Sequence, residues 1–64
     1  MFVIFKNYGV IENMDAVSRI ILKGVSIKME YTNQKYCNYV YGSGDSAKED
    51  FDSVCAQIAR GDDK

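Results

Sequence analysis

The 64-residue sequence contains no tryptophan, no proline and no histidine. Without histidine, a serine or cysteine nucleophile lacks its usual general base, and no spacing of lysine or carboxylate residues points to a substitute. The two cysteines, Cys37 and Cys55, cannot supply the four ligands of a structural zinc site. We therefore expect no enzymatic activity, no metal and no cofactor.

The cysteine count is also low for a small secreted domain, which usually carries several disulfides. We expect Cys37 and Cys55 to be reduced, buried thiols in a cytoplasmic protein, and a disulfide between them is the alternative. No apolar run approaches the roughly 18 residues of a membrane span, so no membrane association is expected.

Neither sign of charge dominates, because eight basic and nine acidic residues leave a formal net charge of −1. Nucleic-acid-binding domains usually carry a basic excess, so nucleic acid is a disfavoured partner. Apolar residues make up 47% of the chain and charged residues 27%, which is typical of a folded domain. The length predicts one marginally stable domain over residues 1–61, followed by a frayed tail at 62–64.

Apolar residues recur with a period of two over the first two-thirds of the chain and then with a helical period. Strands are expected at residues 2–5, 10–11, 17–22, 25–31 and 36–41, and a helix from about residue 46 to residue 60. The predicted fold class is α+β: an antiparallel β-meander of four to five strands with one C-terminal amphipathic helix packed on one face.

The start of the helix shows capping signals. Ser46 and Glu49 match the spacing of a capping box, and Asp45 is the rival N-cap. The predicted buried stripe of the helix consists of Ala47, Phe51, Val54, Cys55, Ile58 and Ala59.

Two turns set which side chains face the helix. A two-residue turn at Lys23-Gly24 pairs Leu22 with Val25 and places Ile20 and Leu22 on the helix side. The turn at 32–35 leaves two registers open, with Asn33 suited to a positive φ. A three-residue loop with a bulge, which we favour, turns Cys37, Tyr39 and Tyr41 toward the helix, and a two- or four-residue loop turns Tyr36, Asn38 and Val40 there.

One helix cannot cover both faces of a sheet, so the opposite face is the predicted partner-binding surface. Its candidate contact residues are Val17, Arg19, Ile21, Lys28, Tyr36 and Val40. The first strand adds either Phe2 and Ile4 or Val3 and Phe5 to this face. The alternatives are a homodimer, a foreign protein partner, or a face shielded by long side chains such as Arg19 and Lys28.

The first half of the predicted helix is acidic. Its carboxylates either offset the helix dipole or form an acidic patch for a basic partner, and they are Asp45, Glu49, Asp50 and Asp52. The segment 42–47 also fits a G-x-G-x-x-A pattern, but the preceding strands are antiparallel and Asp45 would repel phosphate. We therefore interpret its glycines as a tight turn and not as a cofactor site.

In outline, the chain resembles the very short proteins of bacteriophages, prophages and related mobile elements. The resemblance rests on residues 14–20 opening a strand, on the hairpin that follows, and on residues 46–51 opening a terminal helix. It covers the whole chain as a layout and carries over no functional residue. It implies a protein that binds and blocks a host complex, as anti-CRISPR proteins do.

The sequence thus predicts a non-catalytic protein–protein interaction module that acts through the exposed sheet face or the acidic helix. One alternative is a small nucleic-acid-associated regulator that uses Tyr36, Lys28 and Arg19, with the tyrosine stacking on bases. A small structural subunit is the other alternative.

Overall fold

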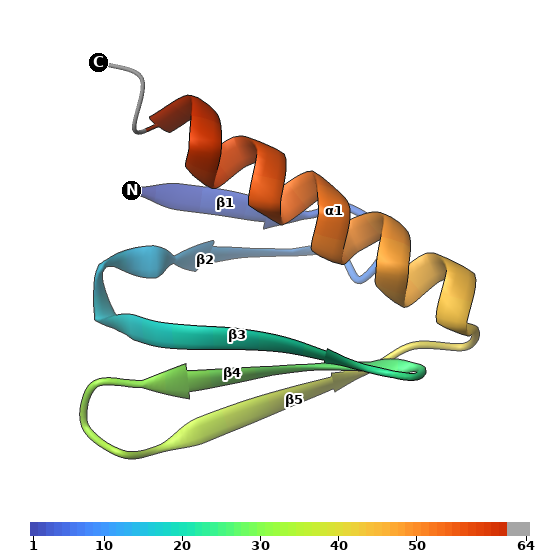
Figure 1. Ribbon diagram of the computed structural model, residues 1–64, viewed down its shortest axis with the longest axis horizontal. Helices are drawn as coiled ribbons and strands as arrows, with labels where there is room; N and C mark the ends of the chain where they lie inside the picture. Colours follow the sequence, from blue (N-terminus) through green and yellow to red (C-terminus); the bar gives the residue numbers. More distant parts are fainter. Residues whose placement is uncertain (62–64) are drawn as a thin grey trace.

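A computed structural model of the chain describes residues 1–61 (Figure 1), and the predicted frayed tail at 62–64 lies outside the described residues. In chain order the elements are β1 (Phe2–Phe5), β2 (Val10–Asn13), the 3-10 helix η1 (Met14–Ala16), β3 (Val17–Lys23), β4 (Ser26–Tyr31), β5 (Tyr36–Val40) and the helix α1 (Gly44–Gly61).

The five strands form two antiparallel sheets, with α1 packed against one side of them (Figure 1). β1 pairs with β2, and β3, β4 and β5 form a three-stranded meander. The predicted α+β class with a C-terminal helix is confirmed. The described strands do not form one continuous sheet, because η1 turns the chain between β2 and β3.

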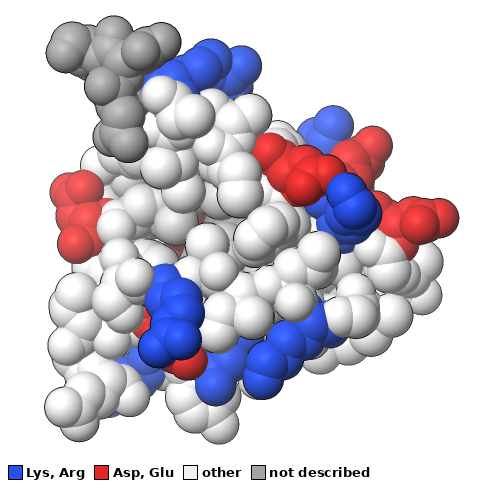
Figure 2. Space-filling model, viewed as in Figure 1, with Lys and Arg blue, Asp and Glu red and all other residues white. Residues whose placement is uncertain are grey.

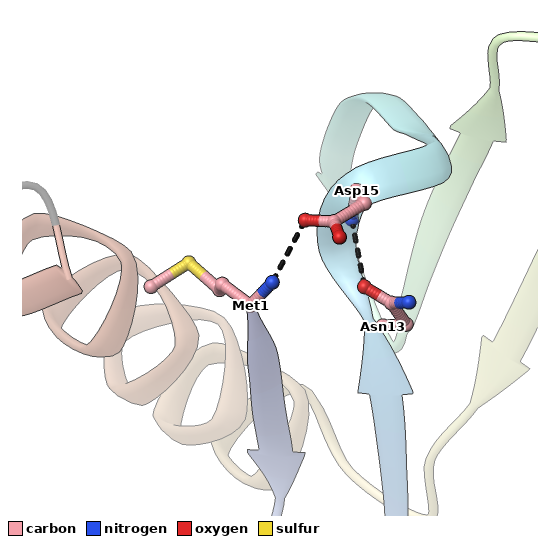
Figure 3. A network of polar contacts seen from close by, with 3 residues as sticks. All are labelled: Met1, Asn13 and Asp15. Carbon is pink, nitrogen blue, oxygen red and sulfur yellow. Dashed lines mark hydrogen bonds and ion pairs between the residues drawn. The ribbon is translucent and has the colours of Figure 1, made fainter.

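Close contacts at the N-terminus hold η1 and the start of β1 together (Figure 3). The ammonium group of Met1 forms an ion pair with Asp15 Oδ1 at 2.7 Å. The Asn13 side chain accepts a hydrogen bond from the Asp15 amide at 3.0 Å, which caps the 3-10 turn.

The core lies between the sheets and the helix. Its fully or almost fully buried apolar residues are Val3, Phe5, Ile27, Met29, Tyr39, Tyr41, Ala47 and Val54. Val3 and Phe5 therefore point inward, and Phe2 and Ile4 point away from the helix. The sequence had left these two possibilities open, because β1 is apolar on both faces.

The turn between β3 and β4 lies one residue later than predicted. Lys23 pairs with Ser26 and Leu22 pairs with Ile27, so Val25 lies exposed in the turn. Gly24 has a φ of +58° at the first central position of the turn, which glycine adopts without steric cost. The predicted pairing of Leu22 with Val25 is wrong by two residues. An even shift preserves the faces, so Ile20 and Leu22 still lie on the helix side.

The favoured register of the last hairpin is confirmed. The Gln34 amide donates to Tyr31 O at 3.1 Å and the Tyr31 amide donates to Lys35 O at 2.8 Å. Gln34 and Lys35 thus both lie opposite Tyr31. This arrangement is the predicted bulge after a three-residue loop. The positive φ, +71°, falls on Gln34 and not on Asn33. The alternation that follows turns Cys37, Tyr39 and Tyr41 toward the helix.

The helix begins earlier than its capping signals predicted. Ser43 Oγ accepts a hydrogen bond from the Ser46 amide at 3.2 Å, which makes Ser43 the N-cap. Neither Asp45 nor Ser46 takes that role. Glu49 does not reach back to the helix start and accepts a hydrogen bond from Asn7 Nδ2 at 2.6 Å.

The buried stripe of α1 differs from the prediction in several members. Cys55 and Ala59 are exposed, whereas Asp50 is fully buried and Gln57 half-buried. Cys37 is half-buried, and both thiols are free. The expectation that both are buried is therefore wrong for Cys55. Among the residues the structure describes, no helix is both long and apolar enough to cross a membrane.

Candidate functional site

A buried carboxylate fixes the β1–β2 hairpin against the helix. Asp50 has no exposed surface and accepts hydrogen bonds from the backbone amides of Asn7 and Tyr8, at 3.0 and 3.1 Å. It also accepts the Tyr41 hydroxyl at 2.7 Å. Asp50 is therefore not part of a surface acidic patch, and its place in the predicted patch is wrong. Donors from the hairpin turn and from Tyr41, the residue after β5, therefore take the place of water around this carboxylate.

The free edge of β1 is closed by a second polar side chain of the helix. Gln57 Nε2 donates to Ile4 O at 2.9 Å, and Gln57 Oε1 accepts from the Ile4 amide at 2.8 Å. The side-chain amide thereby replaces one residue of a neighbouring strand. With Asp50 holding the turn, the inner face and the outer edge of β1 are both occupied by α1.

The outer face of this hairpin remains open. Phe2, Ile4 and Ile11 are 69%, 52% and 66% exposed, and Ile4 lies directly opposite Ile11 in the register. We call these three residues the hairpin patch. Apolar side chains in adjacent positions on both strands make a continuous surface, which differs from the scattered single exposures that are normal.

The outer face of the three-stranded sheet is different, because ion pairs cross it. Glu30 forms ion pairs with Arg19 at 3.2 Å and with Lys28 at 3.5 Å. The Lys28 ammonium also lies 4.8 Å from the centre of the Tyr36 ring. Ile21 is half-buried beside Lys28 in the register. This face is therefore polar over its middle and is not a single apolar surface.

Five of the six predicted contact residues share that outer face, and one does not. Arg19, Ile21 and Lys28 lie over its middle, and Tyr36 and Val40 lie on β5 at its edge. Val17 instead packs against the core on the helix side.

The irregularity in β3 explains that correction. The register shifts between Val17 and Arg19, so Ser18 is an extra residue. A single inserted residue moves a side chain to the opposite face. The signal in the sequence is weak, because Ser18 resembles any outward-facing residue of a strand.

The surface of residues 1–61 includes two hollows of interest. One, of about 630 Å³, lies beside the β4–β5 loop and includes Lys28, Glu30, Lys35 and Tyr36. The other, of about 300 Å³, is lined by residues that include Met14, Ile20 and Ile58, between η1, β3 and the end of the helix. Ser18, which lines both hollows, donates its hydroxyl to the backbone carbonyl oxygen of Glu30 at 3.1 Å.

Charge is unevenly distributed over the molecule (Figure 2). Basic side chains are the more numerous over the lower part of the view, where β3, β4 and β5 lie, and acidic side chains lie at the start of the helix with basic side chains between them. Asp45, Glu49 and Asp52 are the exposed members of the predicted acidic patch. Asp52 forms an ion pair with Lys48 at 3.0 Å, which reduces its free charge.

A cluster of tyrosines joins the two sheets beneath the helix. Tyr8 stacks on Tyr39 with ring centres 4.4 Å apart, and the Tyr39 hydroxyl donates to Glu12 of β2. Two effects raise the pKa of Tyr39 well above its usual value. Burial of the hydroxyl is the larger, and the hydrogen bond to Glu12 is the next. Burial and the bond to Asp50 raise the pKa of Tyr41 as well. Both groups are neutral at ordinary pH and are structural.

Fold and surface together define the class: a small α+β protein with one helix across two antiparallel sheets and an apolar patch on the outer face of the first. Among residues 1–61, no cluster of three or more His, Cys, Asp or Glu side chains could hold a metal ion. Comparisons with protein-family models, with curated proteins and with solved structures found no match for the chain.

Proposed function

We propose that this protein is a non-catalytic protein–protein interaction module that binds its partner through the hairpin patch. The observation that carries the proposal is the exposure of Phe2, Ile4 and Ile11 on the outer face of a hairpin that the helix holds from within. Complete burial of a fully exposed apolar side chain of this size contributes about 1.5–3 kcal/mol. The three patch residues are 52–69% exposed, so covering all three contributes enough to anchor a specific contact.

The charges beside the patch indicate the chemistry of the partner. Asn7, in the turn between β1 and β2, donates to Glu49 of the helix at 2.6 Å, so the acidic start of α1 adjoins the hairpin turn. Glu49 and Asp45 are both exposed there. A complementary partner presents an apolar centre with basic groups on one side, because opposite charges at the rim favour association.

The contacts on the other sheet argue against the nucleic-acid alternative. Arg19 and Lys28, the basic residues proposed to accompany Tyr36, both pair with Glu30. A carboxylate between them repels phosphate and cancels much of the local positive charge. The resemblance to small mobile-element proteins extends the main proposal to an inhibitor that covers a working surface of a host complex.

The test uses the chain as an affinity bait in a lysate of its native host. An Ile11→Asp bait introduces a charge into the patch, and a Val25→Asp bait introduces the same charge at an exposed turn residue on a different part of the surface. We expect a protein that the wild type and Val25→Asp capture and that Ile11→Asp loses. The purified protein should then bind directly with a negative heat-capacity change.

A captured set that is the same for all three baits would contradict the proposal. If circular dichroism shows that Ile11→Asp is unfolded, Phe2→Glu at the first residue of β1 replaces it, and retention of the partner by that variant would equally contradict the proposal.

A further inference from the structure

We propose that the free edge of β5 pairs with the β5 edge of a second copy, so that two three-stranded sheets join into one six-stranded sheet. This inference goes beyond the function proposed above, because it concerns a different surface. The hairpin patch lies on the other sheet and stays open in such a dimer.

The hydrogen-bond pattern fixes which groups of β5 point outward. Tyr31 bonds to Lys35 at one end of the β4–β5 pair, and the Tyr41 amide donates to Val25 O at 2.8 Å at the other end. Residues alternate between facing the partner strand and facing away in an antiparallel pair. The amides and carbonyls of Tyr36, Asn38 and Val40 therefore point away from β4, at the edge of the sheet.

The outer edge of β1 is partly closed, whereas no described residue bonds to the outer edge of β5. Gln57 bonds both the amide and the carbonyl of Ile4, and Asp50 accepts the amides of Asn7 and Tyr8 in the turn after β1. Edge strands are usually protected from pairing by a proline, a charged side chain or a bulge. β5 has none of these between residues 36 and 40. Tyr36 and Val40 are 63% and 64% exposed beside these open backbone groups.

The sequence of β5 is suited to pairing with itself. A two-fold axis through Asn38 places Asn38 opposite its own copy and Tyr36 opposite Val40 of the second copy. In this register, the backbone groups of all three outward residues of each strand lie opposite those of the second copy. Any other two-fold register leaves at least one of the three without an opposite residue in β5. The pairing of an aromatic with a β-branched side chain on one face is a favourable cross-strand contact.

Charges do not oppose this register. Lys28 lies beside Asn38 on β4, and its copy would be three strand spacings away, about 14 Å, which exceeds the screening length at physiological salt. Its charge is also shared with Glu30. A chain of this length has a small core, and joining two copies is a common way to stabilise such a domain.

The test measures the molar mass of the whole chain by sedimentation equilibrium across micromolar to millimolar concentrations. We expect wild type to approach twice the 7.2 kDa mass of the chain. Asn38→Lys and Asn38→Asp each place two like charges face to face at the axis and should weaken the dimer about tenfold. Asn38 is exposed, so both variants should keep the wild-type circular dichroism spectrum.

Mixing the two variants provides the decisive control. Lysine opposite aspartate replaces repulsion with attraction, so an equimolar mixture should regain the dimer affinity that each variant alone has lost. Ile11→Asp, which lies in the hairpin patch, should dimerise as the wild type does. In the wild-type dimer, the amides of Tyr36, Asn38 and Val40 should exchange with solvent more slowly as concentration rises.

Three results would overturn the inference. They are a wild type that stays monomeric throughout, Asn38 variants that each dimerise like the wild type, and a dimer that Ile11→Asp abolishes. The last would place the second copy on the hairpin patch. None of these results depends on whether a foreign partner binds, so failure here is distinguishable from failure of the proposed function.

Discussion

Replacing Asp50 with asparagine tests whether one buried carboxylate holds the first hairpin to the rest of the molecule. The side chain keeps its shape and loses its charge and one acceptor oxygen. In the wild type, Asp50 Oδ2 accepts hydrogen bonds from the Tyr8 amide and the Tyr41 hydroxyl, and both carboxylate oxygens lie 3.0 Å from the Asn7 amide nitrogen. In Asp50→Asn the new NH₂ group must face at least one of these donors.

The expected loss follows from those contacts. A hydrogen bond to a charged group contributes about 1.5–3 kcal/mol, and Asp50 accepts from three donors in a site without solvent. The neutral amide is cheaper to bury than a carboxylate, which offsets part of the loss. We expect a net destabilisation of about 2 kcal/mol, which for a domain of this size lowers the melting temperature by about 8–16 °C.

Urea and thermal unfolding followed by circular dichroism measure this effect. Asp52→Asn is the matched control, because it makes the same chemical change two residues along the same helix at an exposed site. Its ion pair with Lys48 contributes only about 0.3–0.5 kcal/mol. If the two variants differ by less than about 0.5 kcal/mol, the buried carboxylate does not anchor the hairpin and the reasoning fails.

Other predictions concern the last hairpin, the edge of β1 and the response to pH. Gln34→Gly should stabilise the fold by about 0.5–1 kcal/mol in urea unfolding, because glycine adopts the φ of +71° without strain; a loss of stability would contradict this. Gln57→Ala should cost about 1–2 kcal/mol and speed hydrogen exchange of the Ile4 amide, and unchanged exchange would show that the edge is not closed by this side chain. Burial of the Tyr41 hydroxyl and its bond to Asp50 raise the pKa of Tyr41, so the unfolded chain loses this proton first as the pH rises through about 10. The melting temperature should therefore fall between pH 9 and pH 11, and Tyr41→Phe should reduce that fall.

Local patterns in the sequence predicted most of the architecture. The period of two placed the strands and the period of about 3.6 placed the helix, because each reports one buried face of a regular element. The faces of β3 and β4 survived an error of two residues in their register, since side chains repeat every second residue. The register of the last hairpin follows from composition, because the more apolar of the two possible trios, Cys37, Tyr39 and Tyr41, faces the helix.

Single-residue irregularities leave no recognisable signal in the local sequence pattern. The extra residue at Ser18 moves Val17 from the outer face to the core, and nothing in the local composition distinguishes it from a regular strand. The N-cap at Ser43 was missed for a similar reason, since Ser43, Asp45 and Ser46 are all good capping residues.

By itself, the sequence determined which segments alternate, which segment is helical, and that apolar residues outnumber the positions one helix can cover. The tertiary structure alone decided where that excess lies and which polar side chains are buried. Asp50 and Gln57 occupy positions outside the apolar stripe of the helix, yet their partners in the β1 hairpin are 42 to 53 residues away. A buried polar group is stable only when distant donors and acceptors reach it, and no local pattern records that meeting.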